Sequence, residues 1–293
     1  MEAKVHSESY EKSFEQFERD FIREHDAFYR NPAAYWLEPF RIAGDLYYVG
    51  DKMVCVHLID TGEGLLLIDS GYQHTIHLLF QSIWELGFSP KNIRWILHTH
   101  GHFDHFGATN ELRALSGAKS YLSETDARLL EQDPRLGLPC YNPNPYARLP
   151  EMDETFRDGD VLSFGGLRIR CIATPGHTPG VMTFLFDIPG TGSVPLRAGL
   201  FGGTGVLTMY RAFLKRYGQP ESCRQDFLRS LEKVREEHVD VVLGNHPGQN
   251  RTVEKRMRVL AGETGNPFVD SEEWEHFIAE NRRNFQRFLS HDR

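Results

Sequence analysis

One short stretch combines four histidines with an aspartate: His98-Thr99-His100-Gly101-His102-Phe103-Asp104-His105. It directly follows an apolar run, residues 93–97, which is typical of a buried strand. Imidazole nitrogen and carboxylate oxygen are the ligands that zinc accepts where no thiolate is offered. His100 and His102 can turn both rings to one ion, while Asp104 and His105 point to a second. Gly101 lets the backbone bend tightly between these ligands.

Two further histidines lie in turns that follow predicted strands. His177 is part of Thr-Pro-Gly-His-Thr-Pro-Gly at 174–180, and His246 is part of Gly-Asn-His-Pro-Gly at 244–248. Proline and glycine fix rigid turns that present both side chains. Together the six residues would give each of two ions three protein ligands and leave positions for water, as in catalytic zinc sites. His98 is interpreted as a buried residue beside the site.

The surrounding sequence predicts two strand-rich halves with helices outside them, and no linker divides them. We therefore expect one α/β domain over residues 32–293. Strands are predicted at 41–49 with a turn at Gly44-Asp45, and at 53–59, 65–68, 93–97, 167–173, 181–186 and 239–243. Helices are predicted at 73–86, 220–237 and 271–289, with a shorter one opened by a capping box at 123–126. Residues 133–150 contain five prolines and predict an irregular loop, either a wall of the site or an excursion without a role.

Residues 1–31 are predicted to form an N-terminal helical extension. Tyr10, Phe14, Phe17, Phe21 and Phe28 make one apolar stripe on an otherwise charged helix. The dipeptide at 31–32, Asn-Pro, should end it. Packing against the main domain is the simplest use of the stripe. A contact between two copies of the chain, giving a homo-oligomer, and a lid are the alternatives.

Composition narrows the classes of partner. The chain has 293 residues, of which 40% are hydrophobic and 25% charged, as in ordinary globular proteins. Its formal net charge of −8 argues against a nucleic-acid groove. No stretch approaches the roughly 20 apolar residues that span a bilayer. We expect a small-molecule substrate and neither a nucleic-acid nor a membrane partner.

The first residues and the cysteines indicate the cellular compartment in which the protein is expected. No apolar signal segment is seen at the start, which predicts a cytoplasmic protein, or a periplasmic or secreted one if a leader has been removed. Cys55, Cys140, Cys171 and Cys223 lie far apart without a Cys-x-x-Cys pair. Neither disulfides nor thiolate ligands for zinc are therefore expected. Cys55 and Cys171 stand in apolar runs and are predicted to be buried.

The H-x-H-x-D-H stretch and the P-G-H-T-P-G turn together resemble the metallo-β-lactamase superfamily. The resemblance runs from about Trp36 to the C-terminus and implies an αββα sandwich with two zinc ions at one rim of the sheets. It assigns ligands to the first zinc at His100, His102 and His177, and to the second at Asp104, His105 and His246. Asp69, after the strand 65–68, matches the family's strand-end aspartate and is expected to support the ligands from behind.

One departure indicates the branch of the superfamily. Many members carry a Gly-Asp whose aspartate bridges both metals, and the first two β-lactamase subclasses carry a cysteine nearby. Residues 200–205, Leu-Phe-Gly-Gly-Thr-Gly, contain neither. An all-His/Asp site resembles the third subclass of class B β-lactamases, as do segments 36–50, 244–248 and 265–268. The missing leader is a second departure, and it weighs against β-lactams as the physiological substrate.

The resemblance implies a hydrolase that opens a β-lactam ring by attack of a metal-bound hydroxide. Asp104 is expected to be catalytic as well as a ligand, because it could orient the nucleophile and relay a proton. Substrate contacts are predicted at two threonines, for a carboxylate, and at three pocket-wall aromatics: Thr204, Thr208, Trp36, Phe103 and Tyr210. The plainer interpretations are that the two threonine hydroxyls cap turns and that the three aromatic side chains belong to the core.

Several alternatives stay open. A lactone or thioester hydrolase could use the same metals. A non-catalytic scaffold, in which the metals only stabilise the fold, would show closed coordination. An iron oxidoreductase of this fold would be expected to carry Glu at the position of His102. A nuclease would be expected to carry the bridging aspartate and an added nucleic-acid module.

Overall fold

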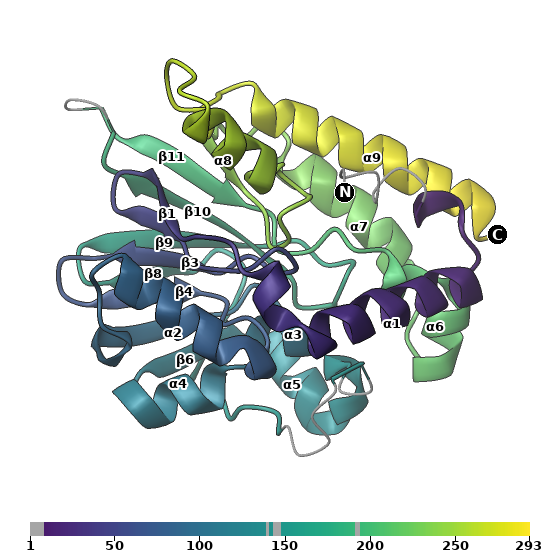
Figure 1. Cartoon of the computed structure of the whole chain (residues 1–293). Coiled ribbons are helices and arrows are strands. Elements are labelled where there is room, and N and C mark those ends of the chain that lie inside the picture. The colour runs from purple at the N-terminus through teal and green to yellow at the C-terminus, as the bar shows by residue number, and fades with distance from the viewer. Residues whose placement is uncertain (1–8, 139–140, 143–147, 191–193) are drawn as a thin grey trace.

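The computed structural model describes residues 9–138, 141–142, 148–190 and 194–293. Two β-sheets lie face to face, with helices on both outer sides (Figure 1). The seven-stranded sheet has the order β1 Phe40–Ala43, β2 Leu46–Tyr48, β3 His57–Asp60, β4 Leu65–Ile68, β5 Ile93–Leu97, β6 Lys119–Ser123 and β7 Glu154–Phe156. The five-stranded sheet has the order β12 Val241–Leu243, β11 Leu196–Leu200, β10 Met182–Ile188, β9 Leu167–Ala173 and β8 Val161–Phe164. The predicted αββα sandwich, the fold of its structural neighbours, is confirmed.

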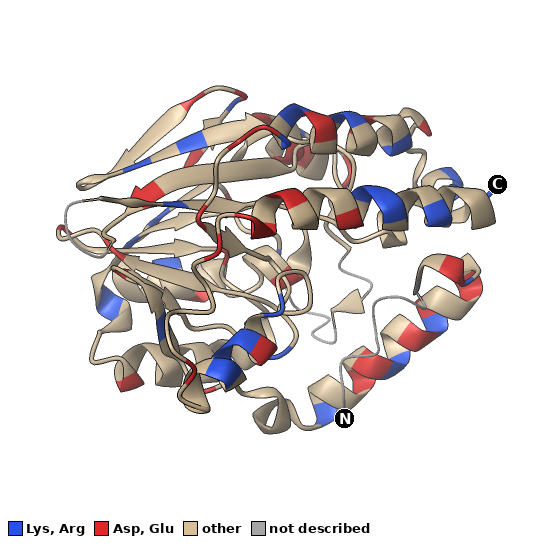
Figure 2. Ribbon diagram, turned by 90° about the horizontal axis from the view of Figure 1, so that it is seen from above, with Lys and Arg blue, Asp and Glu red and all other residues tan. Residues whose placement is uncertain are grey.

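The helices fall into two sets along the chain. Within the first half they are α1 Phe14–Arg30, α2 Ile76–Glu85, α3 Phe103–Phe106, α4 Thr109–Ser116 and α5 Glu124–Gln132. Within the second half they are α6 Arg211–Tyr217, α7 Ser222–Val234, α8 Thr252–Leu260 and α9 Glu273–His291. Acidic and basic residues are interspersed along α1, whereas along α9 the acidic residues precede the basic ones (Figure 2).

Strand β4 shows how the sandwich is built from alternation. Leu65 and Leu67 pack on the outer side of their sheet with Leu79 of α2, whereas Leu66 and Ile68 pack into the space between the sheets. All four strand residues are buried. A strand covered on both faces needs a continuous apolar run, and this explains why the sequence there shows no polar alternation.

The site lies where strands end. β4, β5 and β6 are parallel neighbours, so their carboxyl ends share one edge of the seven-stranded sheet. β11 and β12 are also parallel. The histidine-rich stretch follows β5, the turn with His177 joins β9 to β10, and His246 follows β12. The sandwich thus brings loops from both sheets to one rim.

The N-terminal helix forms as predicted. Ser13 caps α1, because its hydroxyl accepts from the backbone N–H of Gln16 and the Gln16 side chain accepts from the backbone of Ser13. Phe14 and Phe28 are buried, and their rings lie against Tyr210 and other aromatics of the main domain. The apolar stripe therefore packs on its own chain. The domain boundary at 31/32 and a homo-oligomer through α1 stay predictions.

A few local predictions were inexact. The strand predicted from residue 53 begins at His57, because Asp51 accepts hydrogen bonds from the backbone N–H groups of Met53 and Val54 and holds them in a turn. The helix predicted at 73–86 starts with a 3₁₀ turn at Gln73–Thr75. The helix predicted at 220–237 is shorter at both ends.

Two further expectations concern cysteines and membranes. Cys55, Cys171 and Cys223 are buried and form no disulfide, and Cys140 lies outside the described residues. The predicted irregular loop at 133–150 also lies partly outside them, and its described start is a 3₁₀ turn at Pro134–Gly137. None of the helices in the described ranges is long and apolar enough to cross a membrane.

Candidate metal centre

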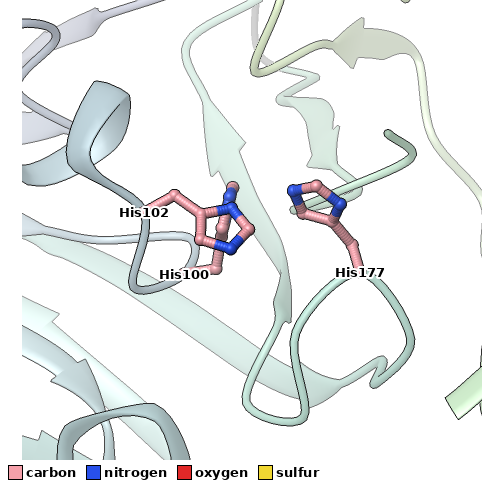
Figure 3. Close-up of side chains that lie close together, drawn as sticks. All are labelled: His100, His102 and His177. Atoms are coloured by element: carbon pink, nitrogen blue, oxygen red, sulfur yellow. The ribbon is translucent and has the colours of Figure 1, made fainter. Parts of the chain in front are cut away.

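The structure brings the six predicted ligands together in two groups of three. The first metal group is His100, His102 and His177, and the second metal group is Asp104, His105 and His246. Within each group the potential ligand atoms lie within 4.8 Å of one another. In the first group the three ring centroids are 4.6, 4.7 and 4.8 Å apart, and the rings from the two loops face each other (Figure 3).

The second metal group is arranged around one carboxylate. Oδ2 of Asp104 lies 3.4 Å from Nε2 of His105 and 3.5 Å from Nε2 of His246. The ring centroids of His100 and His105 are 4.2 Å apart, so the two groups are neighbours. Asp104 and His105 lie on the single-turn helix α3, which points both side chains to the same rim.

Hydrogen bonds at the far nitrogens orient the rings. Nδ1 of His177 donates to the carbonyl of Gly205 at 2.7 Å, and Nδ1 of His246 donates to the carbonyl of Met53 at 2.8 Å. A carbonyl only accepts, so the proton stays on Nδ1 and Nε2 is directed at the group. This arrangement is usual for metal-ligating histidines.

Two buried nitrogen atoms support a metal ion further. Nε2 of His100 is buried and has no hydrogen-bond partner, and the buried Nε2 of His105 has only the Asp104 carboxylate, at 3.4 Å, beside it. Such orphaned polar atoms are rare in proteins and call for a bound group. The imidazole and carboxylate donors, and the lack of any thiolate among the six, fit zinc.

Asp69 connects both metal groups from behind. Its carboxylate accepts from Nδ1 of His105 at 2.8 Å and from the Thr99 hydroxyl at 2.9 Å. Since that hydroxyl donates to Asp69, it accepts from Nδ1 of His100, 3.0 Å away. One carboxylate therefore orients a ring in each group. The sequence predicted Asp69 but not Thr99, whose only signal is its place between two histidines.

The electrostatics of the first metal group favour neutral rings. Burial and the neighbouring imidazoles hold the pKa of His100 and of His102 well below the usual range. Burial also lowers the pKa of His177 to about 4. Neutral imidazole is the form that binds metal, so a cation can enter this group near pH 7 without displacing a proton.

The second metal group differs in charge. Burial alone would lower the pKa of His105, but the carboxylates of Asp104 and Asp69 outweigh it and raise the pKa to about 10. Burial would raise the pKa of Asp104, but the imidazoles of His105 and His246 hold it well below its usual range. Asp104 is therefore ionised near pH 7, and His105 carries a proton that a metal ion must displace.

The stretch after β11, which lacks a bridging acid, carries glycines that pack on His177. A Cβ on Gly203 would lie 2.8 Å from Cδ2 of His177, and one on Gly205 would lie 3.0 Å from Cε1 of the same ring. Side chains are excluded here because the backbone itself packs on the ring. Among the described residues, the two metal groups contain no acid or cysteine beyond the six predicted positions.

The two predicted substrate-binding threonines lie close to the first metal group. The Thr208 hydroxyl donates to the backbone carbonyl of His177 at 2.6 Å and lies 3.3 Å from Nδ1 of the same residue. Its proton is thus used within the protein, which favours a role in holding His177. Thr204 is buried, with 7% of its surface exposed. Contact of either threonine with a substrate stays a prediction.

The three aromatic residues predicted to line the pocket lie in different parts of the structure. Phe103 is buried beside the ligands on α3, with its ring 5.5 Å from that of Tyr72. Tyr210 is fully buried beneath α1. Trp36 packs towards α2, where its indole nitrogen donates to the Ser82 hydroxyl at 3.2 Å. His98 is buried as expected. Substrate contacts of the three aromatics stay predictions.

Comparison with known proteins relates the chain to the metallo-beta-lactamase superfamily. Residues 49–191 match the family model described as the metallo-beta-lactamase superfamily. The structure is similar to BJP-1 of Bradyrhizobium japonicum, described as a subclass B3 metallo-beta-lactamase, with a TM-score of 0.76 and 28% identity. That match covers 88% of this chain and 97% of BJP-1.

Two curated relatives are described as hydroxyacylglutathione hydrolases. The chain is 36% identical over 92 residues to a hydroxyacylglutathione hydrolase of Acidiphilium cryptum, covering 31% of this chain and 30% of that protein. It is 34% identical over 137 residues to hydroxyacylglutathione hydrolase GloC of Haemophilus influenzae, covering 45% of this chain and 59% of that protein. The chain thus spans less than two thirds of these relatives' length.

Proposed function

Because the chain belongs to the metallo-β-lactamase superfamily, we propose that it is a zinc-dependent hydrolase that opens a β-lactam ring. The observation that carries this proposal is the pair of three-donor groups, side by side and without a shared carboxylate among the described residues. BJP-1, whose fold the chain shares, is described as a metallo-beta-lactamase of subclass B3. The expected products are those of water added across the ring C–N bond.

The chain's own residues supply the ligands for two zinc ions. His100, His102 and His177 would hold one ion, and the second metal group would hold the other. Zinc, when bound, lowers the pKa of a water from about 15.7 towards about 7 and polarises a carbonyl. A site with three protein donors per ion leaves coordination positions for water and substrate.

Asp104 is a charged hydrogen-bond acceptor as well as a candidate ligand. It stays ionised because neighbouring imidazoles hold its pKa low. Its Oδ2 faces the two histidines of its group, so we assign Oδ1 to accept a hydrogen bond from the attacking water. In the hydrolysis the water oxygen joins the carbonyl carbon, the C–N bond breaks, and a water proton passes through Oδ1 to the departing nitrogen.

Turnover of a chromogenic cephalosporin by zinc-loaded protein tests this function. We expect turnover that a chelator abolishes and added zinc restores. The matched variant is Asp104→Asn, which keeps the shape of the side chain but removes the charge and the proton acceptor. No cephalosporin turnover by protein with two zinc ions bound would reject the β-lactamase proposal.

A second candidate is hydrolysis of a thioester or lactone, and the hydroxyacylglutathione hydrolases among the relatives support it. The same zinc-loaded protein should then cleave a glutathione thioester or an acyl-homoserine lactone faster than the cephalosporin. The glycines packed on His177 weigh against it, since Gly203 and Gly205 offer no carboxylate that could bridge two metal ions. Chelator-sensitive turnover of any of these substrates would reject the non-catalytic scaffold.

A further inference from the structure

The first metal group depends on two loops that come from different sheets. His100 and His102 follow β5 of the seven-stranded sheet, whereas His177 lies between β9 and β10 of the five-stranded sheet. Metal ligation tolerates errors of only a few tenths of an ångström in donor position. Some contact must therefore fix the distance between the two loops before an ion arrives.

The carboxylate of Asp126 connects these two loops. Its Oδ2 accepts from the backbone N–H of Gly101 at 2.9 Å and from the Thr178 hydroxyl at 2.7 Å. Its Oδ1 accepts from the backbone N–H of Gly180 at 2.7 Å. Gly101 stands between His100 and His102, and Thr178 directly follows the third histidine. Each side of the clamp is therefore one residue away from a predicted ligand.

Burial raises the pKa of Asp126, and the hydrogen bonds from Thr178, Gly101 and Gly180 counter this effect by favouring the ionised carboxylate. Asp126 is only 3% exposed, and hydrogen bonds to an ionised carboxylate are about twice as strong as neutral ones. The space around it is closed: a Cβ on Gly180 would lie 2.3 Å from Oγ of Ser123 and 2.5 Å from Oδ1 of Asp126. Glycine at 180 thus lets the turn approach the carboxylate.

Helix capping does not account for the Asp126 side chain. The cap of α5 is made by the Ser123 hydroxyl, which accepts from the backbone N–H of Asp126 at 3.2 Å. The carboxylate itself points to the two metal-binding loops, and none of its three donors belongs to α5.

We propose that Asp126 is a positioning residue that sets the separation between the His100/His102 loop and the His177 turn, and thereby the zinc affinity of the first metal group. The inference rests on the proposed metal centre. It assigns no contact between Asp126 and the ion or the substrate. The second metal group should be independent of Asp126.

The test uses two graded variants and one matched control in the full-length chain. Asp126→Asn keeps the shape but has one acceptor oxygen, so the backbone N–H of either Gly101 or Gly180 must lose its acceptor. Thr178→Val removes a single donor and leaves both backbone bonds. Asp153→Asn is the control, because Asp153 accepts from the backbone N–H and hydroxyl of Ser120 at the opposite end of β6.

Zinc affinity is measured by competition with a chromogenic chelator, and ligand geometry by the absorption spectrum of the cobalt(II)-loaded protein. For Asp126→Asn we expect one zinc site weakened by about 10- to 100-fold and the other unchanged, with an altered cobalt spectrum. Thr178→Val should weaken the same site by a smaller factor. Asp153→Asn should lower the melting temperature while leaving both zinc affinities within about twofold of wild type.

Wild-type zinc affinities and cobalt spectrum in Asp126→Asn would overturn the inference while leaving the proposed function intact. If Asp126→Asn does not fold, an unchanged first-site affinity in Thr178→Val would overturn it equally. A wild-type chain that takes up no zinc would overturn the metal centre and the inference with it.

Discussion

Nδ1 of His105 donates a hydrogen bond of 2.8 Å to the carboxylate of Asp69. This contact fixes the ring so that Nε2 faces the second metal group, and it makes the ring a stronger base. Asp69 has a backbone φ of 62°, a conformation that non-glycine residues rarely adopt. The strain is maintained because the side chain is buried and accepts several hydrogen bonds.

Asp69→Asn should weaken zinc binding at both metal groups, by about 10- to 100-fold. Asparagine tolerates the positive φ, so the backbone is expected to stay in place. The effect reaches the first group through the Thr99 hydroxyl, which links Asp69 to His100. Zinc titration with a competing chelator measures it. Loss confined to one group would contradict the role of Asp69 as a shared support.

His177→Ala should lower the zinc content from two ions per chain to one, because the first metal group keeps only two donors. The second metal group shares no residue with it and should keep its affinity. Elemental analysis after dialysis checks the stoichiometry. His238→Ala is the control, since this side chain is 70% exposed and belongs to neither group. Two tightly bound ions in His177→Ala would show that the groups are wrongly assigned.

Zinc uptake should release a proton only at the second metal group. The pKa of His105 is raised to about 10, so below that pH the metal-free ring is charged and an ion must displace its proton. Apparent affinity there should therefore fall about tenfold for each pH unit as the pH drops from 9 to 6. The pKa of His177 is lowered to about 4, so the first group should show almost no dependence in this range. Calorimetric titration in two buffers of different ionisation enthalpy counts the protons, and equal release at both sites would refute the assignment.

Phe28→Ala should destabilise the metal-free chain by about 3 to 5 kcal/mol, because it leaves a cavity under α1. The Phe28 ring is fully buried and lies 5.1 Å from that of Tyr72. Ile22→Ala on the same helix is the matched control: Ile22 is 51% exposed, and its loss should change stability by less than about 0.5 kcal/mol. Urea unfolding provides the free energies. Similar losses in both variants would mean that α1 does not dock as the structure shows.

The sequence was most informative where residues with the same chemical role lie close together along the chain. The six metal donors stand in short motifs after apolar strands, and the family resemblance that these motifs carry implied both the sandwich and the assignment of donors such as His102 and His177 to two groups. The N-terminal helix was equally predictable, because its stripe of aromatic residues repeats at helical spacing and Asn31 ends it.

Contacts between the two halves were not predictable. The S-x-x-D pattern at 123–126 indicated a capping box, and the Ser123 cap does form. The Asp126 carboxylate, however, bonds to Thr178, which is 52 positions away. Thr99 was missed for the same reason: its hydroxyl can reach Asp69 only because the end of β4 lies beside the end of β5. Such partners depend on which loops the fold brings together, and a local sequence pattern does not indicate which loops these are.

Each metal group draws donors from both sheets, with His177 and His246 contributed by the second. A bound ion would therefore act as a cross-link that holds the sandwich shut, and at a hundredfold excess over its dissociation constant it would add about 2.7 kcal/mol to folding. The lifetime of the protein would then follow the zinc supply of its surroundings. When zinc is scarce, the protein would then lose stability as well as activity.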